Sequence, residues 1–170
     1  NDAGQVLEVN PVTDIATLVG AVLPGTNAKY YKSILHPNGK IYFIPYNATK
    51  VLEFNPNTNT STLIGSDLGA IVGKYVIGAV ASNGKIYAAP ASTGKTLVID
   101  PTAGTTSLIG VDLGAAVGKY YYTITGNNGK LYGIPTNANK VLEIDPNTDN
   151  ANLINNDVSR GVAGEALYWT

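Results

Sequence analysis

Three segments of the sequence combine side chains that could bind a polar ligand: "PYNATK" at 45–50, "PASTGK" at 90–95 and "PTNANK" at 135–140. Each segment ends in a lysine and carries amide or hydroxyl groups, which donate and accept directional hydrogen bonds. A second repeated element, "GKY" at 73–75 and 118–120, adds a lysine and a tyrosine, whose ring is apolar and whose hydroxyl is polar. This combination suits the hydroxyl groups of a carbohydrate or of a polar polymer.

These segments predict a non-catalytic binding module that recognises carbohydrate or another polar ligand at several equivalent sites, an arrangement that raises avidity. The candidate ligand-binding residues are Tyr46, Asn47, Lys50, Lys74, Tyr75, Ser92, Lys95, Lys119, Tyr120, Asn137 and Lys140. Two alternatives stay open. In the first, the lysines at 50, 95 and 140 only solubilise the start of a strand, and the tyrosines at 30, 75 and 120 only pack between neighbouring sheets. In the second, the chain is a structural or assembly module that contacts other protein chains.

Residues suited to catalysis or metal binding are scarce. His36 is the one histidine, it lies in the turn-like segment "HPNGK", and the sequence has no cysteine. A Ser-His-Asp arrangement with a nucleophile elbow is absent, and so is a cluster with metal-ligand spacing. Asp67, Asp112 and Asp157 recur in similar loops and could form a ring of carboxylates, although a turn-stabilising role is favoured. We therefore predict no enzymatic activity, no metal and no cofactor.

Composition limits the remaining classes of partner. The chain has 170 residues, 14% of them charged, and a net charge of −1, so no basic surplus supports nucleic-acid binding. It contains no apolar run long enough to predict a membrane-spanning helix. The low charge and the many Asn, Thr and Gly residues favour an extracellular location, and two sequons, at Asn47 and Asn59, would allow glycosylation of a secreted chain. The absence of methionine predicts a processed chain or a fragment.

The elements that must position these residues repeat every 45 positions. "NGKIY" starts at 38 and 83 and "NGKLY" at 128, while "VLEVNP", "VLEFNP", "TLVIDP" and "VLEIDP" start at 6, 51, 96 and 141. A period of this length without insertions indicates a solenoid or a propeller. Within one repeat we predict strands at 30–36, 40–45, 51–55 and 61–64, because these stretches are rich in Val, Ile, Tyr and Thr and are bounded by Gly, Pro and Asn.

The turns between these strands have recognisable chemistry. "PNGK" predicts a tight hairpin with an Asn-Gly type I′ turn, and "NPNT" and "DPNT" predict turns in which the Asx side chain bonds the backbone two residues on. Four antiparallel strands in each repeat make one blade of a β-propeller. In such a blade the loops after the second and fourth strands emerge on one face of the ring, which is the face with the candidate ligand-binding residues.

The segment "NGKIYFIPYNATKVLEFNPNT" at 38–58 resembles the repeats of β-propeller proteins of the YVTN, NHL and kelch-like kinds. In those repeats a "GxxY" strand is followed by a "VxxxDPxT" strand. The resemblance extends over nearly the whole chain. It implies the propeller fold and a tendency to bind partners, and it implies no particular reaction.

We predict one all-β domain over 1–170, with repeats at 21–65, 66–110 and 111–155 and a composite blade formed by 156–170 with 1–20. This arrangement gives a closed ring of four blades without an unpaired edge. The alternative is a larger ring, built by two chains or by a longer precursor. The predicted partners are a carbohydrate or polar polymer and, on the second interpretation, another protein or a second copy of the chain.

Overall fold

The computed structural model describes residues 4–23, 28–154 and 158. Within these residues the regular structure consists of antiparallel β-strands in three four-stranded sheets and one two-stranded sheet. The strands are β1 (Val6–Asn10), β2 (Ile15–Val19), β3 (Tyr30–Leu35), β4 (Ile41–Pro45), β5 (Val51–Asn55), β6 (Thr60–Ile64), β7 (Ala79–Val80), β8 (Ile86–Ala88), β9 (Thr96–Asp100), β10 (Thr105–Ile109), β11 (Tyr120–Thr125), β12 (Leu131–Pro135), β13 (Leu142–Asp145) and β14 (Asn150–Leu153). No described segment is a helix long and apolar enough to cross a membrane.

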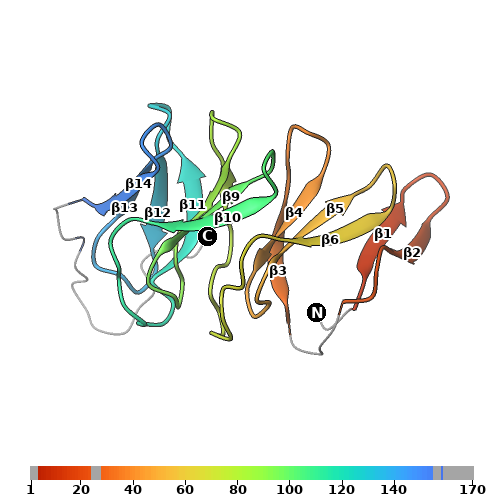
Figure 1. The fold of residues 1–170 in the computed structure, drawn as a ribbon, viewed down its shortest axis with the longest axis horizontal. Helices are drawn as coiled ribbons and strands as arrows, with labels where there is room; N and C mark the ends of the chain where they lie inside the picture. The colour runs from red at the N-terminus through yellow and green to blue at the C-terminus, as the bar shows by residue number, and fades with distance from the viewer. Residues whose placement is uncertain (1–3, 24–27, 155–157, 159–170) are drawn as a thin grey trace.

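Each four-stranded sheet pairs its strands in the order of the sequence, so each is a blade of the predicted kind. We call β3–β6 blade 1, β7–β10 blade 2, β11–β14 blade 3, and the hairpin β1–β2 the half-blade. Figure 1 shows them side by side in a row, with the half-blade at one end and blade 3 at the other. The strands of blades 1, 2 and 3 lie within the predicted repeats 21–65, 66–110 and 111–155.

The strand predictions agree closely with the structure in blade 1, where β5 has the predicted bounds and the other three strands differ by one residue at an end. Blade 2 differs more, because its first strand, which the 45-residue period leads us to expect after the "GKY" at 73–75, is reduced to the two residues of β7. Gly78 interrupts this strand, and glycine lacks a side chain that could pack on a sheet. It also allows a close approach, since a Cβ atom at this position would lie 2.9 Å from the carbonyl oxygen of Tyr87.

The first hairpin of each blade has another turn type than predicted. Gly39 has a positive φ of 81°, but Asn38 does not, whereas a type I′ turn needs positive φ at both residues. The Gly39 N–H donates to the His36 carbonyl, and the His36 N–H donates to the Lys40 carbonyl. This pattern is a three-residue loop whose glycine forms a bulge. The type I′ prediction was therefore wrong, and the glycine is still required.

The turns after the third strands are confirmed. The backbone N–H of Asn57 donates to the side chain of Asn55 over 3.0 Å, and the N–H of Thr102 donates to Asp100 over 2.9 Å. A residue with positive φ follows in each turn, namely Asp14, Asn59, Gly104 and Asp149. These short local bonds fix where each third strand ends and each fourth strand begins.

The core lies between neighbouring blades. One cluster joins blade 1 to blade 2 and includes Tyr42, Ile44, Ile86 and Leu97, each with no exposed surface. A second cluster joins blade 2 to blade 3 around residues such as Tyr87 and Leu131. Alternate residues of a strand point to opposite faces, so the inner strands of blade 2 bury both of their faces. Stability therefore depends on sheet-to-sheet contact along the row.

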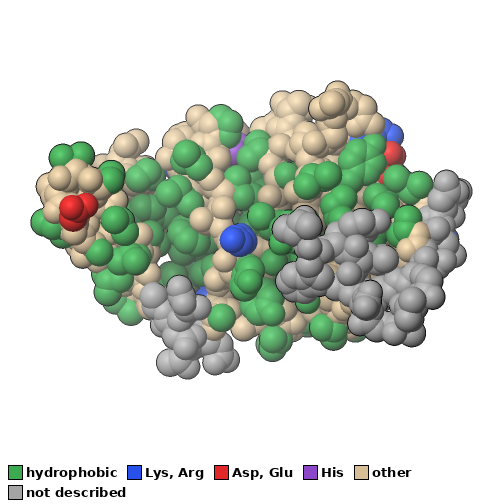
Figure 2. All heavy atoms as spheres, turned by 180° about the vertical axis from the view of Figure 1, so that it is seen from behind, with side chains coloured by type: hydrophobic (Ala, Val, Ile, Leu, Met, Phe, Trp, Pro, Cys, Tyr) green, Lys and Arg blue, Asp and Glu red, His purple; other side chains and the backbone are tan. Residues whose placement is uncertain are grey.

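The first strands of the blades lie on one side of the molecule. In Figure 1 the fourth strands β6 and β10 are in front, and Figure 2 shows the opposite side, where hydrophobic side chains gather in a band across the surface. In a propeller this side faces the ring axis, and we call it the axial side. The predicted closing segment 156–170 lies outside the described residues, except for Val158, so ring closure by this segment stays a prediction.

Candidate functional site

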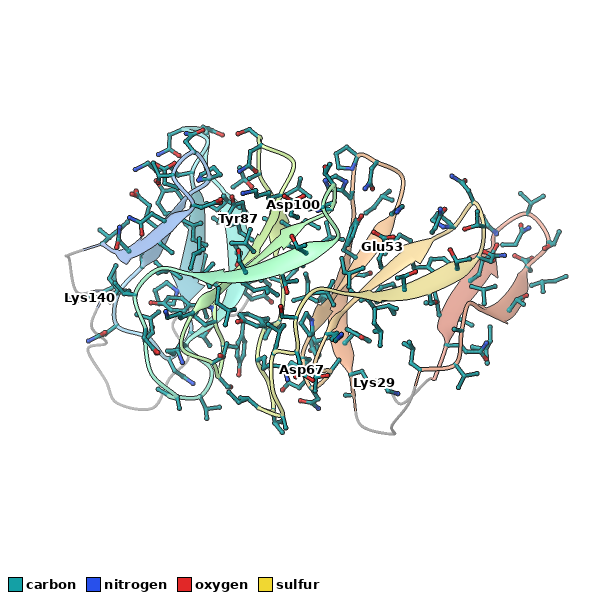
Figure 3. All side chains as sticks on the ribbon, in the orientation of Figure 1. Lys29, Glu53, Asp67, Tyr87, Asp100 and Lys140 are labelled. Carbon is teal, nitrogen blue, oxygen red and sulfur yellow. The ribbon has the colours of Figure 1, made fainter. Side chains whose placement is uncertain are left out.

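The loops expected to form the binding face do lie together. The loop after β4 bonds the loop before blade 2, because the Lys74 N–H donates to the Tyr46 carbonyl over 2.9 Å and the Gly73 N–H donates to Oδ1 of Asn47 over 3.0 Å. Figure 3 shows Lys29, Asp67 and Lys140 toward this side of the molecule and Glu53, Tyr87 and Asp100 nearer the opposite one. We call this surface the loop face.

Two of the predicted ligand-binding lysines are buried beneath the loop face. Lys74 has no exposed surface, and its ammonium group donates to the carbonyl oxygens of Gly69 and Ile71 over 2.9 and 2.7 Å. Lys119 repeats this pattern with the carbonyls of residues 114 and 116. Burial lowers the pKa of both lysines, and the nearby carboxylates of residues 67 and 112 oppose that shift. These ammonium groups hold the loops in shape and are not available to a ligand on the surface.

Lys29 is the equivalent lysine of blade 1. Among the described residues its buried ammonium group has no hydrogen-bond partner. The positions equivalent to Gly69 and Ile71 are 24 and 26, which lie outside the described residues.

Two of the predicted ligand-binding tyrosines are also buried. Tyr75 and Tyr120 are each 1% exposed, and their hydroxyl groups donate to the carbonyl oxygens of Lys95 and Lys140 over 3.0 and 2.8 Å. Tyr30 makes the same bond to residue 50. For Tyr75 and Tyr120 the structure thus corrects the assignment to a ligand site in favour of packing, since each ring lies in a cluster between neighbouring blades and each hydroxyl bonds the loop after the second strand.

The other predicted residues have mixed surroundings. The Asn47 side chain accepts a hydrogen bond from the Gly73 N–H, and Ser92 is 6% exposed. Half-buried side chains are those of Tyr46, Lys50, Lys95 and Lys140. Asn137 is exposed, and its amide donates to the Val117 carbonyl over 3.2 Å. The structure brings four predicted residues together along a groove of about 400 Å³ in blade 3: Lys119, Tyr120, Asn137 and Lys140. Ligand binding by the accessible members of this set stays a prediction.

Sequence reasoning missed a pocket on the axial side. It measures about 250 Å³ and is lined by Tyr31, Lys32, Tyr46, Val76, Ile77, Tyr121 and Tyr122. These residues come from the beginning of β3 and β11, from the segment before β7 and from the loop after β4. The signal was present in "KYYK", "KYVI" and "KYYY", where the two residues after the packed tyrosine change from repeat to repeat while the Lys-Tyr pair before them does not.

The pocket has aromatic walls, an apolar floor and a cation at its rim. The rings of Tyr31 and Tyr46 are 5.7 Å apart between centroids, and the Lys32 ammonium lies 6.0 Å from the centroid of Tyr31. Tyr31 is 61% exposed and Tyr122 is 45% exposed, so large aromatic surfaces face the opening. None of the lining residues is acidic. The pocket can therefore take up an apolar planar group, and its charge favours a neutral or anionic ligand over a cationic one.

The groups considered for catalysis are engaged in structural contacts. Asp67 and Asp112 accept bonds from the N–H groups of Gly69 and Gly114 over 2.7 and 2.9 Å, as expected for turn-stabilising residues; Asp157 lies outside the described residues. His36 is 9% exposed, and its Nε2 lies 2.9 Å from the Gly84 carbonyl of blade 2. The described part of the chain holds no group of three or more His, Cys, Asp or Glu side chains that could bind a metal.

The buried tyrosines make the fold sensitive to alkaline pH. Burial raises the pKa of Tyr30, Tyr42 and Tyr120 from 10.0 to about 12. A folded-state pKa above the unfolded value means that this stabilisation is complete below pH 10 and is lost between pH 10 and about 12. We expect unfolding in that window, with tyrosinate absorbance and circular dichroism changing together. Complete ionisation of the tyrosines with the dichroism unchanged would contradict this expectation.

Comparison with known proteins gives a fold. No protein-family model matches the chain, and no curated protein matches it. A catalytically inactive virginiamycin B lyase from Staphylococcus aureus, solved with quinupristin, has a TM-score of 0.72 at 14% identity, over 91% of this chain and 49% of the lyase. An auxiliary nutrient binding protein from Bacteroides thetaiotaomicron has a TM-score of 0.59 at 14% identity, over 90% of this chain and 42% of that protein. The chain therefore spans about half the length of these structures.

These findings correct the function predicted from the sequence. The neighbours found include virginiamycin B lyase, which is an enzyme, and they connect the chain to a fold and not to carbohydrate binding. The prediction of a non-catalytic carbohydrate-binding module was therefore wrong. At 14% identity the lyases show neither the presence nor the absence of catalysis in this chain. The predicted architecture is confirmed by the repeated antiparallel sheets and by the match to these structures: this chain has the β-propeller fold.

Proposed function

We propose that this protein binds a small aromatic ligand in the axial pocket. The observation that carries the proposal is that tyrosines from blades 1 and 3, together with the apolar pair Val76 and Ile77 of blade 2, converge on one pocket. The pocket brings together tyrosines from two blades, which a single blade could not do. Contiguous exposed apolar surface of this kind commonly marks a binding site. The volume is slightly below the roughly 300 Å³ at which drug-sized ligand sites begin, which favours a small ligand or one aromatic group of a larger one.

The charge of the pocket narrows the class of ligand. Lys32 is exposed at the rim beside the ring of Tyr31, and the lining contains no carboxylate that would neutralise it. An aromatic ligand with an anionic substituent can stack on the tyrosines and pair with this ammonium group.

The proposal also includes an extracellular location. The low content of charged residues supports it, and so does the likeness to the nutrient binding protein and to the extracellular domain of a hybrid two-component system from B. thetaiotaomicron, which has a TM-score of 0.57 at 20% identity over 78% of this chain and 17% of that one.

Two related dyes test the pocket: anionic 8-anilinonaphthalene-1-sulfonate and its neutral counterpart N-phenyl-1-naphthylamine. We expect saturable fluorescence enhancement with both dyes. The double substitution Tyr31→Ala and Tyr122→Ala should weaken binding of both by about tenfold, since each stacked ring is worth about 0.5–1.5 kcal/mol. Lys32→Ala should weaken binding of the anionic dye by several-fold and leave the neutral dye unchanged.

Leu108→Ala is the matched control, because Leu108 lies on β10, away from the pocket, and is 46% exposed. It should bind both dyes as the unsubstituted chain does. The proposal fails if the two tyrosine substitutions leave dye binding unchanged while circular dichroism shows an intact fold, or if Leu108→Ala weakens binding equally.

A further inference from the structure

The two ends of the row of blades expose faces that are buried wherever two blades meet inside the chain. At one end, Leu7 and Val9 of the half-blade are 59% and 62% exposed. The residues 45 positions later, Leu52 and Phe54, are 1% and 4% exposed. Leu18 lies opposite Leu7 in the hairpin and extends this surface with 56% exposure. We call Leu7, Val9 and Leu18 the leading face.

At the other end, blade 3 exposes the face that in blade 1 packs against the next blade. It is formed by Tyr132, Ile134, Val141 and Ile154, and we call it the trailing face. The first three are half-buried and Ile154 is 37% exposed. Their equivalents 90 positions earlier are Tyr42, Ile44, Val51 and Ile64, which are 0–8% exposed because they pack against blade 2. Among the described residues, no sheet packs on the trailing face.

These two faces are complementary, because faces of the same two types pack against each other inside the chain. At the junction of blades 1 and 2 and at the junction of blades 2 and 3, the trailing face of one blade packs against the leading face of the next, and the two hydrophobic clusters consist of such pairs. The trailing face of blade 3 and the leading face of the half-blade, on which no described sheet packs, are therefore the two sides of one more junction. Exposed apolar surface of this kind marks a protein interface more often than a solvated surface.

We propose that the trailing face of blade 3 binds the leading face of the half-blade of a second copy of this chain. Two copies can make this contact twice and close a ring with two-fold symmetry. The ring would contain twice the number of blades that one chain supplies. The contact concerns the ends of the row and does not depend on a ligand in the axial pocket.

Light scattering of the full chain tests the contact. The expected particle has the mass of two chains over a wide range of concentration. Leu7→Asp with Val9→Asp blocks the leading face, and Val141→Asp with Ile154→Asp blocks the trailing face. Each double variant alone should be a monomer, because burial of an unpaired carboxylate in an apolar contact is unfavourable.

Mixing the two double variants separates a specific contact from a loss of folding. One copy then retains a free trailing face and the other a free leading face, so the mixture should recover a particle of two chains joined by one contact. Val117→Asp, at a loop position that is 72% exposed, should leave the mass of the unsubstituted assembly unchanged. A monomeric unsubstituted chain would overturn the proposal, and so would a mixture that stays monomeric while both variants retain the β-sheet dichroism.

Discussion

The variant Asp149→Gly is expected to have a free energy of unfolding about 2 kcal/mol lower than the unsubstituted chain. Asp149 lies in the turn between β13 and β14 of blade 3, but its carboxylate binds two side chains of blade 2. It accepts bonds from the Lys85 ammonium and from the Tyr87 hydroxyl, each over 2.5 Å. Tyr87 has no exposed surface, so loss of the carboxylate leaves a buried hydroxyl with one fewer partner. Urea unfolding followed by circular dichroism measures the change.

A second substitution should restore the lost stability. At the junction of blades 1 and 2 the carboxylate comes from Glu53 of β5, which accepts a bond from the Tyr42 hydroxyl over 2.8 Å, and the neighbouring turn carries Gly104. At the junction of blades 2 and 3 the position of Glu53 is taken by Val98 and that of Gly104 by Asp149. The double variant Val98→Glu with Asp149→Gly reproduces the first arrangement. We expect it to recover most of the free energy that Asp149→Gly loses.

Asp14→Gly is the control for this pair. Asp14 occupies the equivalent turn of the half-blade, is exposed, and has a similar positive φ of 53°. Glycine adopts positive φ more readily than aspartate, so this variant should be as stable as the unsubstituted chain or slightly more so. If Asp149→Gly and Asp14→Gly have the same stability, or if the double variant is no more stable than Asp149→Gly alone, the link between blades is not what stabilises the junction.

The effect of Asp149→Gly should also depend on pH. Burial raises the pKa of Asp149, but bonds from Lys85 and Tyr87 lower it by more, so the pKa lies below its ordinary value. A folded-state pKa below the unfolded value means that the stabilisation is present above the unfolded pKa and is lost as the pH falls through the folded one. The difference in stability between the variant and the unsubstituted chain should therefore be constant near neutrality and shrink below about pH 4.

The second large effect is expected for Lys74→Met, which should lower the free energy of unfolding by about 2–3 kcal/mol. Methionine fills much of the same volume, but it cannot donate to the carbonyl oxygens of Gly69 and Ile71 that surround the buried ammonium group. The loop between blades 1 and 2 then loses the group around which it folds. Hydrogen exchange should show faster exchange of the Leu68 N–H, which donates to the Thr49 carbonyl at the base of this loop.

Lys95→Met is the matched control on the loop face. Lys95 is half-buried, and its backbone carbonyl, which accepts the bond from Tyr75, is unaffected by the substitution. We expect a change within about 0.5 kcal/mol, as is usual for surface positions. Equal destabilisation by the two substitutions would show that the buried carbonyl contacts of Lys74 are not the cause.

Much of the blade architecture follows from local sequence. The 45-residue period, the Asx-Pro turns and the glycine of each first hairpin act over a few residues, which is why β3–β6 lie within one residue of their predicted bounds. The one wrong turn type concerns φ at Asn38, where the sequence "NG" is compatible with more than one hairpin loop. Local signals of this kind do not depend on how the blades pack.

The roles of equivalent polar residues could not be read in the same way. Lys74 and Lys95 both end a repeated loop segment in "GK", yet one is fully buried and the other is partly exposed. The difference arises because the loop that precedes Lys74 wraps around its ammonium group. The path of that loop is set by the bonds that Leu68 and Lys74 donate to the carbonyl oxygens of the loop after β4. Sequence periodicity identifies equivalent positions but not their exposure.

The sequence by itself determined the strands, their antiparallel order within each blade and the repetition of the blades, because turn chemistry and strand alternation are short-range properties. Only the tertiary structure decided which tyrosines are packed and which face the axis, and that Asp149 replaces a missing glutamate in another blade. Both outcomes depend on contacts between residues far apart in the chain, since Tyr87 and Asp149 are 62 positions apart. Such contacts exist only once the blades stand side by side.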